Sequence, residues 1–279
     1  MAQPAGAASI YVAIRVRPFV PREKKAKEDT CVECRHPEIN LINKNSGSVQ
    51  TFELDEIWDS SCSPSNPLYF DQDKVYNKMG RSILEVVEDG YNAALFAYGQ
   101  TGSGKTTSIM GDMNPPKERG ILPRLLFDLF EFYTAKKKAG WKVDVRVRML
   151  EIYNERIQDL LRPNVNAGGP GGATQKKLDV RMHPKLGVYV PDLTINAVET
   201  ASDCIHLLEY GITMKTVAAT QMNAQSSRAH TIFAMKIEKE IKEGYGERHE
   251  SNEVFIVDLA GRENERTTLA TGERLGEVS

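Results

Sequence analysis

The sequence of 279 residues lacks any long hydrophobic run. No apolar stretch approaches the roughly 18 residues that a membrane-spanning helix requires. The N-terminus also lacks the pattern of a charged segment followed by an apolar one that marks a secretory signal. We therefore expect no direct membrane insertion and a cytoplasmic location.

A dominant charge of either sign is also absent. Lysine and arginine number 36 against 38 aspartates and glutamates, which gives a formal net charge of −2. Such a balance produces no global basic field, so binding to a polyanionic surface would need a local patch. The lysine clusters at residues 24–27 and 136–138 are interpreted as solvated loop or helix ends. We predict no nucleic-acid partner.

Cysteines are few, and the four that occur fit a reducing compartment. Cys31 and Cys34, with His36 nearby, resemble half of a zinc-binding pattern. A structural zinc site normally needs a second ligand pair at suitable spacing, and the sequence offers none. The role of Cys31 and Cys34 is left open.

A glycine-rich loop follows the apolar run that starts at Ala93. The spacing Gly99-x4-Gly104-Lys105-Thr106 is that of a phosphate loop. Its backbone N–H groups surround an anion, Lys105 reaches the β- and γ-phosphates, and the Thr106 hydroxyl binds Mg²⁺. The predicted phosphate-binding residues are Gly99, Gln100, Thr101, Gly102, Ser103, Gly104, Lys105 and Thr106. This loop predicts ATP and Mg²⁺ as ligands.

A second Mg²⁺ ligand is expected at Asp258. The run Val254–Val257 is wholly apolar, as in a strand buried on both faces of a parallel or mixed sheet. Ligands of open α/β sheets bind beyond the carboxyl ends of the strands, so Asp258 and the phosphate loop should meet there. Read without the phosphate loop, Asp258 is equally well an ordinary turn residue.

A polar segment from Asn223 to His230 precedes another strand-like run, Thr231–Ile237. Ser226, Ser227 and Arg228 suit a loop that binds Mg²⁺, through Ser227, and senses the γ-phosphate. Read alone, the segment is more often an ordinary polar loop than a binding loop. Gly261 and Glu263 follow Asp258, and an ion pair between Arg228 and Glu263 would close the site.

Together these segments resemble the phosphate loop, switch I and switch II of kinesin motor domains. The residues involved are Gly99–Thr106, Asn223–His230 and Asp258–Glu263, with Glu151–Glu155 as a further match. The resemblance covers residues 9–279, and Leu178–Val190 and Thr216–Thr220 look most like the kinesin-three transport subfamily. It implies that Arg15, Arg17, Pro18 and Thr107 bind the nucleotide on its adenine side and that Asn223 also binds it. It further implies that microtubules are the partner, reached through the parent protein.

Three positions depart from the family pattern. Kinesins usually carry serine where Ala229 and Arg262 stand, and many place an aromatic residue or histidine at Thr107. None of these changes removes a residue assigned to Mg²⁺ or to the closing ion pair.

The coarse pattern predicts one α/β domain over residues 1–279, with a mixed, mostly parallel central sheet and helices on both faces. Strands are expected at 9–16 and from Val143, helices at 74–89 and 121–138, and a loop at Gly168–Gly172. Thr200 to Asp203 predicts a capping box that starts another helix.

The kinesin resemblance implies that the chain stops before the main tubulin-binding elements and the last central strand. That strand lies between the first strand and the phosphate-loop strand, so two strand edges are expected to lack a partner. We favour a fragment of a longer polypeptide, poorly folded or inactive as a motor when isolated.

The leading function is a kinesin-type, Mg²⁺-dependent ATPase that acts on microtubules. Three alternatives stay open: a structural microtubule-associated protein that binds nucleotide but turns over slowly, a truncated product without motor activity, and an unrelated phosphate-loop enzyme such as a small-molecule kinase. Cargo, direction, speed and oligomeric state are not encoded in these residues.

Overall fold

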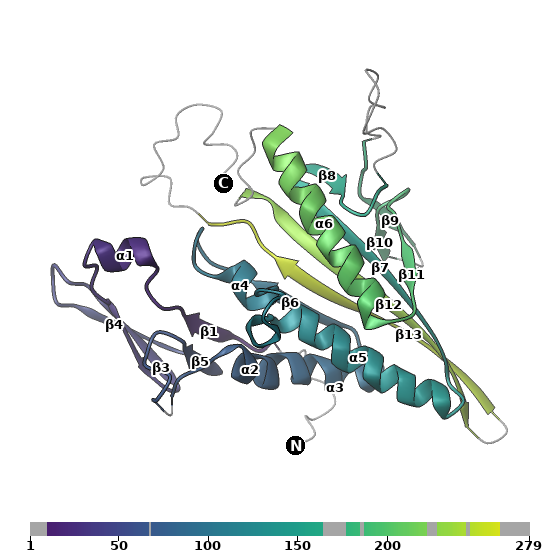
Figure 1. Ribbon diagram of the computed structural model, residues 1–279, viewed down its shortest axis with the longest axis horizontal. Helices are drawn as coiled ribbons and strands as arrows, with labels where there is room; N and C mark the ends of the chain where they lie inside the picture. Colours follow the sequence, from purple (N-terminus) through teal and green to yellow (C-terminus); the bar gives the residue numbers. More distant parts are fainter. Residues whose placement is uncertain are drawn as a thin grey trace. The chain divides into compact units, whose positions relative to one another are not determined.

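The computed structural model describes residues 10–66, 68–163, 177–184, 187–221, 228–243 and 246–262. They belong to two compact units, one within Met1–Val75 and the other within Tyr76–Ser279. Each unit is described by itself below, with elements labelled as in Figure 1. The single domain predicted over residues 1–279 stays a prediction. The predicted loop at Gly168–Gly172 lies outside the described residues.

The first unit is built on two small sheets. In one, two strands pair in parallel: β1 (Ala13–Val16) and β5 (Glu56–Asp59). The other is an antiparallel meander of β2 (Val32–Arg35), β3 (Glu38–Ile42) and β4 (Val49–Glu53). Two short helices complete it, α1 (Pro21–Lys25) and α2 (Gln72–Val75). The strand expected over residues 9–16 is therefore present in its C-terminal half.

An ion pair fixes the start of α1. The Arg17 guanidinium donates hydrogen bonds to both carboxylate oxygens of Glu23 at 2.7 Å each. These bonds, followed by the hydrogen bond that Val20 N–H donates, lower the pKa of Glu23 from 4.5 to about 2. A depressed carboxyl pKa stabilises the fold above the unfolded-state pKa, and this stabilisation is lost as the pH falls toward the folded-state value.

Replacing Glu23 with glutamine is therefore expected to lower the melting temperature near neutral pH. The difference from the wild type should shrink as the pH falls from 4.5 to about 2, because Glu23 itself becomes protonated. Thermal denaturation across this pH range measures the difference, with Glu28→Gln as a control on the same surface. A difference that stays constant with pH would contradict the assignment.

The second unit contains a six-stranded sheet. The strand order is β11-β7-β12-β13-β6, and β8 pairs with β7 outside this path. The bounds are β6 (Ala93–Ala97), β7 (Lys142–Tyr153), β8 (Arg156–Asp159), β11 (Asn196–Val198), β12 (His230–Glu243) and β13 (Gly246–Asp258). A separate hairpin is formed by β9 (Arg181–His183) and β10 (Gly187–Tyr189).

This sheet is mixed, as predicted, and the fold is α/β. Its pairings in the described residues are more antiparallel than the prediction of a mostly parallel sheet, because β13 and β6 form its one parallel pair there. The reason is local. The strands expected at Thr231–Ile237 and Val254–Asp258 are longer than predicted and form one hairpin, in which Glu243 pairs with Gly246. Strands joined by so short a connection must run antiparallel.

Helices of the second unit pack in one layer over this sheet. They are α3 (Arg81–Glu88), α4 (Lys105–Ile109), α5 (Ile121–Lys138) and α6 (Ala201–Gln221), with the short turns η1 (Tyr76–Gly80) and η2 (Pro116–Glu118). Because α5 contacts α3, α4 and α6, all four helices lie on the same side of the sheet (Figure 1). The helices expected on the second face are absent from the described residues. None of the described helices is long and apolar enough to span a membrane.

Two helix predictions are confirmed and one is corrected. The helix at residues 121–138 has the predicted bounds, and its apolar stripe, including Leu125 and Leu129, is fully buried. Thr200 and Asp203 form the predicted reciprocal cap of α6. The helix expected over 74–89 is interrupted by the wider turn η1, which ends at Gly80. A side chain there would clash with the Tyr76 ring, whose hydroxyl donates to Asp128 at 2.6 Å.

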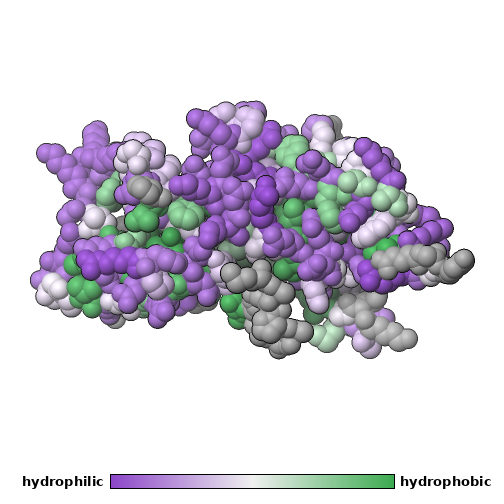
Figure 2. Space-filling model, turned by 90° about the horizontal axis from the view of Figure 1, so that it is seen from below, coloured by the Kyte–Doolittle hydropathy of each residue, from purple (hydrophilic) through white to green (hydrophobic). Residues whose placement is uncertain are grey.

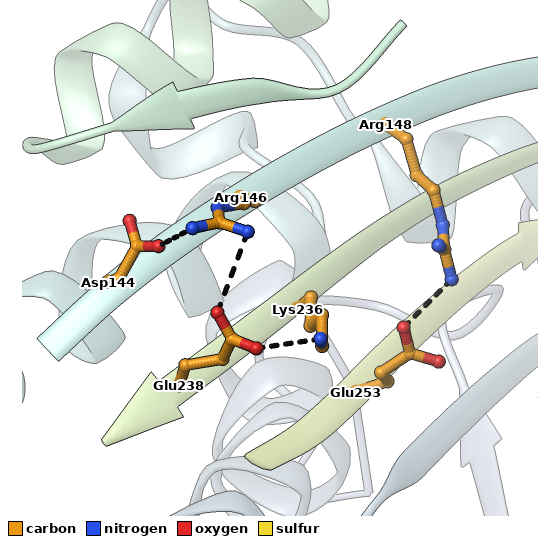
Figure 3. Close-up of polar contacts among 6 residues, drawn as sticks. All are labelled: Asp144, Arg146, Arg148, Lys236, Glu238 and Glu253. Carbon is orange, nitrogen blue, oxygen red and sulfur yellow. Dashed lines mark hydrogen bonds and ion pairs between the residues drawn. The ribbon is translucent and has the colours of Figure 1, made fainter. Parts of the chain in front are cut away.

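The second face of the sheet carries ion pairs (Figure 3). Arg146 contacts Asp144 at 2.6 Å and Glu238 at 3.6 Å, and Lys236 contacts Glu238 at 2.7 Å. Along β12, these outward charges alternate with buried residues such as Met235 and Ile237. The same alternation occurs in β7, where Val145 and Val147 are buried and Arg146 between them is exposed. It lets one face of the strands meet water while the other packs on the helices.

Two strands have a single partner each in the described residues, and the strand that the resemblance places between them stays a prediction. There, β1 pairs only with β5 and β6 only with β13. Phe96 in β6 is 60% exposed. Hydrophilic residues dominate the surface visible in Figure 2, and hydrophobic residues appear on it in separate groups.

Candidate nucleotide-binding site

The phosphate loop lies between β6 and α4, as predicted. Gly102 and Gly104 have φ angles of +77° and +97°, which side chains on L-residues rarely allow. The loop is closed by its own lysine, since Lys105 Nζ donates to the carbonyl oxygens of Gly99 at 2.9 Å and Gln100 at 3.1 Å. The predicted cation therefore lies over the loop whose backbone would bind phosphate.

Asp258 and Thr106 meet at the carboxyl end of the parallel strand pair β6 and β13. The Thr106 hydroxyl donates to Asp258 Oδ2 at 2.6 Å, although the two residues are 152 positions apart. The other carboxylate oxygen, Asp258 Oδ1, is buried and has no hydrogen-bond partner among the described residues. Buried carboxylate oxygens normally have partners. A hydroxyl beside an unsatisfied carboxylate oxygen is a donor set that suits Mg²⁺.

The chain continues beside the phosphate loop after Asp258. Leu259 N–H donates to the Ala97 carbonyl at 3.2 Å, and Arg262 N–H donates to the Gly99 carbonyl at 3.3 Å. The Arg262 guanidinium donates to the Tyr98 hydroxyl at 3.3 Å. Gly261, one residue before Arg262, therefore lies close to the first glycine of the loop, and its role in the site stays a prediction.

Three further polar contacts near the site were not predicted. Ala260 N–H donates to Nδ1 of His230 at 3.1 Å and so ties the start of β12 to the segment after β13. Lys215 in α6 donates to the Thr231 hydroxyl at 2.6 Å and lies 3.7 Å from a carboxylate oxygen of Glu151. Burial raises the pKa of Glu151, and Lys215 partly offsets this effect. Glu151 begins a segment that the sequence singled out, but nothing in the sequence marked Lys215.

Several predicted residues of the two switch segments fall outside the described part of the chain. Asn223, Ser226, Ser227 and Glu263 lie outside the described residues. Arg228 is described and half-buried, but its predicted partner is not described, so their ion pair stays a prediction.

The three residues expected near adenine belong to the first unit. Arg15 donates to Ser60 at 2.9 Å and to Gln72 at 2.7 Å. Arg17 is paired with Glu23 and also donates to the Pro18 carbonyl at 2.9 Å. The predicted adenine-side role of Arg15, Arg17 and Pro18, like that of Thr107 in the second unit, stays a prediction.

Comparison with known proteins bears on the whole chain. The family model for the kinesin motor domain matches residues 15–279. The chain belongs to the kinesin motor domain family. Kinesin-like protein unc-104 of Caenorhabditis elegans is 39% identical over 274 residues, and kinesin-like protein KIF1B of Homo sapiens is 38% identical. These relatives agree with the predicted likeness to the kinesin-three subfamily.

A solved kinesin structure agrees in fold. It is a KIF14 structure with ADP in complex with a microtubule, and it has a TM-score of 0.82 and 36% identity over 97% of this chain and 74% of that one. By contrast, the match covers 96% of this chain but 16% of unc-104, and 97% of this chain but 14% of KIF1B. The chain therefore spans about a sixth of the length of these curated relatives.

The structure shows the surroundings of two positions that depart from the kinesin pattern, Ala229 and Arg262. Ala229 is 6% exposed, so a serine there would have to place its hydroxyl in a buried environment. Arg262 directs its charge to Tyr98. Within the described residues no group of three histidine, cysteine or acidic side chains is arranged to hold a metal. The role of Cys31 and Cys34 stays open.

Proposed function

We propose that this kinesin motor domain binds and hydrolyses MgATP and acts on microtubules. The observation that carries the proposal is the contact of Thr106 with Asp258 beside the phosphate loop, where Asp258 Oδ1 has no hydrogen-bond partner in the described part of the chain. A hydroxyl and a carboxylate that converge next to a phosphate loop are the ligand set of phosphate-loop NTPases for Mg²⁺. The ADP and the microtubule named for the KIF14 structure support the same ligand and partner.

Each site residue has a proposed role. Lys105 leaves the loop carbonyls to bind the β- and γ-phosphates, and Thr106, Ser227 and Asp258 hold Mg²⁺. The chemistry that Mg²⁺ supplies when bound is neutralisation of phosphate charge. Residues on the two switch segments surround the γ-phosphate and orient water: Asn223, Ser226, Arg228, Gly261 and Glu263.

Closure of the site depends on the two switch segments. The hydrogen bond between Ala260 and His230 holds their inner ends together, two residues from Arg228 and three from Glu263. An ion pair between Arg228 and Glu263 would form when the γ-phosphate orders both segments and break after hydrolysis. The proposed location is the cytoplasm, on the microtubule cytoskeleton. We also propose that residues 1–279 belong to one motor domain.

Microtubule-stimulated phosphate release tests this function. The assay uses the complete polypeptide that contains this chain, because the chain spans only a small share of its relatives. Thr106→Ser keeps the hydroxyl and should retain the rate. Thr106→Val keeps the shape but removes the hydroxyl that is assigned to Mg²⁺. A polar contact to a charged group is worth about 1.5–3 kcal/mol, and its loss should lower the rate roughly ten- to hundredfold.

The outcomes separate the alternatives. Tight MgATP binding without microtubule stimulation in the wild type would favour a nucleotide-binding structural protein. Stimulated release that is equal in Thr106→Val and in the wild type would refute the assigned Mg²⁺ site while leaving the motor function intact.

A further inference from the structure

A partly buried polar contact joins the helix layer to the sheet beside the candidate Mg²⁺ site. Lys215 lies in the second half of α6, and its side chain is 20% exposed. Its Nζ donates to Thr231 Oγ1 at 2.6 Å and lies 3.7 Å from Glu151 Oε1. Thr231 and Glu151 are both buried and face each other across β12 and β7. One helical cation is thus held by two neighbouring strands.

The same row of the sheet leads to Asp258. Thr231 pairs with Glu151 on one side and with Asp258 on the other, so the three residues form a row across β7, β12 and β13. Residues directly opposite each other in a sheet point to the same face. Lys215 of α6 contacts the first two residues of this row, and Thr106 of α4 contacts the third. The row therefore links α6 with the phosphate-loop helix.

Lys215 also holds the second half of α6 close to the start of β12. The helix ends at Gln221, six residues after Lys215, and Arg228 and Ala229 precede the strand whose second residue is Thr231. A contact between Lys215 and Thr231 therefore sets the distance between the end of the helix and the start of the strand. Arg228 lies close to this contact in the sequence, shortly before Thr231.

We infer that Lys215 is a positioning residue that holds the end of α6 against β12 and thereby places Arg228 relative to Asp258. The inference rests on the proposed ATPase function. The Nζ of Lys215 is taken up by Thr231 and Glu151, so we assign it no contact with phosphate. Its effect on turnover is exerted through Thr231 and the switch segment.

If Lys215 only stabilised the fold, its variants would give a different pattern of melting temperature and kcat. Lys215→Met leaves the Glu151 carboxylate buried without its cation, which destabilises the fold. The double variant Lys215→Met with Glu151→Gln removes this unpaired charge but does not restore the bond to Thr231. Stability and positioning are therefore separated by comparing the single with the double variant.

The experiment measures kcat and KM for MgATP in the complete polypeptide with microtubules, together with melting temperature. Lys215→Arg should retain kcat. Lys215→Met should lose about tenfold in kcat with little change in KM, because a group displaced by a fraction of an ångström affects the transition state most. The double variant should regain melting temperature but not kcat. Lys142→Met is the matched control, because Lys142 forms an exposed pair with Glu240 at 2.6 Å.

Recovery of kcat in the double variant would overturn the inference and leave Lys215 as a stability residue only. Amide hydrogen exchange provides a readout that needs no turnover. Exchange at the end of α6 and the start of β12 should rise in the double variant and not in Lys142→Met. Unchanged exchange would overturn the positioning role, whereas a wild type without ATPase activity would refute the proposed function alone.

Discussion

Lys105→Ala is expected to abolish tight binding of MgATP. Lys105 is the one side chain that the phosphate-loop pattern assigns to the β- and γ-phosphates as a cation. Its Nζ already lies over the loop, donating to Gly99 and Gln100 at 2.9 and 3.1 Å, so ATP has only to replace two carbonyl acceptors. Phosphate oxygens are stronger acceptors, because both partners of the bond are then charged.

The expected loss is large. A hydrogen bond to a charged group is worth about 1.5–3 kcal/mol, so the loss of two such bonds weakens binding by more than about a hundredfold. Titration with a fluorescent ATP analogue measures the affinity, and steady-state phosphate release measures turnover. Lys138→Ala, in the last turn of α5, serves as a control for the loss of one surface charge. Unchanged affinity together with unchanged turnover would refute the phosphate-loop assignment.

Neutralising Arg228 or Glu263 is expected to slow ATP turnover about a hundredfold, which corresponds to a loss of roughly 3 kcal/mol in transition-state stabilisation. Nucleotide affinity should change much less, because the ion pair is proposed to form only around the γ-phosphate. A hydrogen bond between the two switch segments supports this pairing. Ala260 donates to His230 at 3.1 Å, so the two segments that carry Arg228 and Glu263 start from joined positions.

A double-mutant cycle tests whether the two residues act as a unit. Arg228→Ala with Glu263→Ala should be little slower than either single variant, since losing one partner already breaks the pair. Single-turnover phosphate release gives the rates. Arg146→Ala is the matched control, because it removes an arginine paired with Asp144 and Glu238 on the second face of the sheet (Figure 3). Losses that add up in the cycle would show that Arg228 and Glu263 work separately.

Several features of the fold were predictable because their causes are local in the sequence. The helix Ile121–Lys138 has its apolar stripe, its early proline and its lysine-rich last turn within 18 residues. The phosphate loop has its glycines, lysine and threonine within eight positions. Such patterns depend on backbone conformation and periodicity alone, so they predict structure without knowledge of what packs on them.

Other features depended on neighbours distant in the sequence. The strand predicted at Thr231–Ile237 extends to Glu243 as part of a hairpin. Its inward position 239 is a lysine, which breaks the apolar alternation. Lys239 is fully buried because Glu250 on the partner strand lies 3.0 Å from it. A buried charge is stable only when it is paired, and the pairing follows from the register of the two strands.

The sequence by itself therefore determined the chemistry of this kinesin motor domain: a phosphate loop, a strand that ends in Asp258 and the polar switch segments. The tertiary structure alone decided how these parts are connected. It joined Thr106 to Asp258 and His230 to Ala260, and it placed Lys215 between Thr231 and Glu151. The physical reason is that these contacts join side chains from different strands and helices, and such contacts exist only once register and packing have brought the elements together.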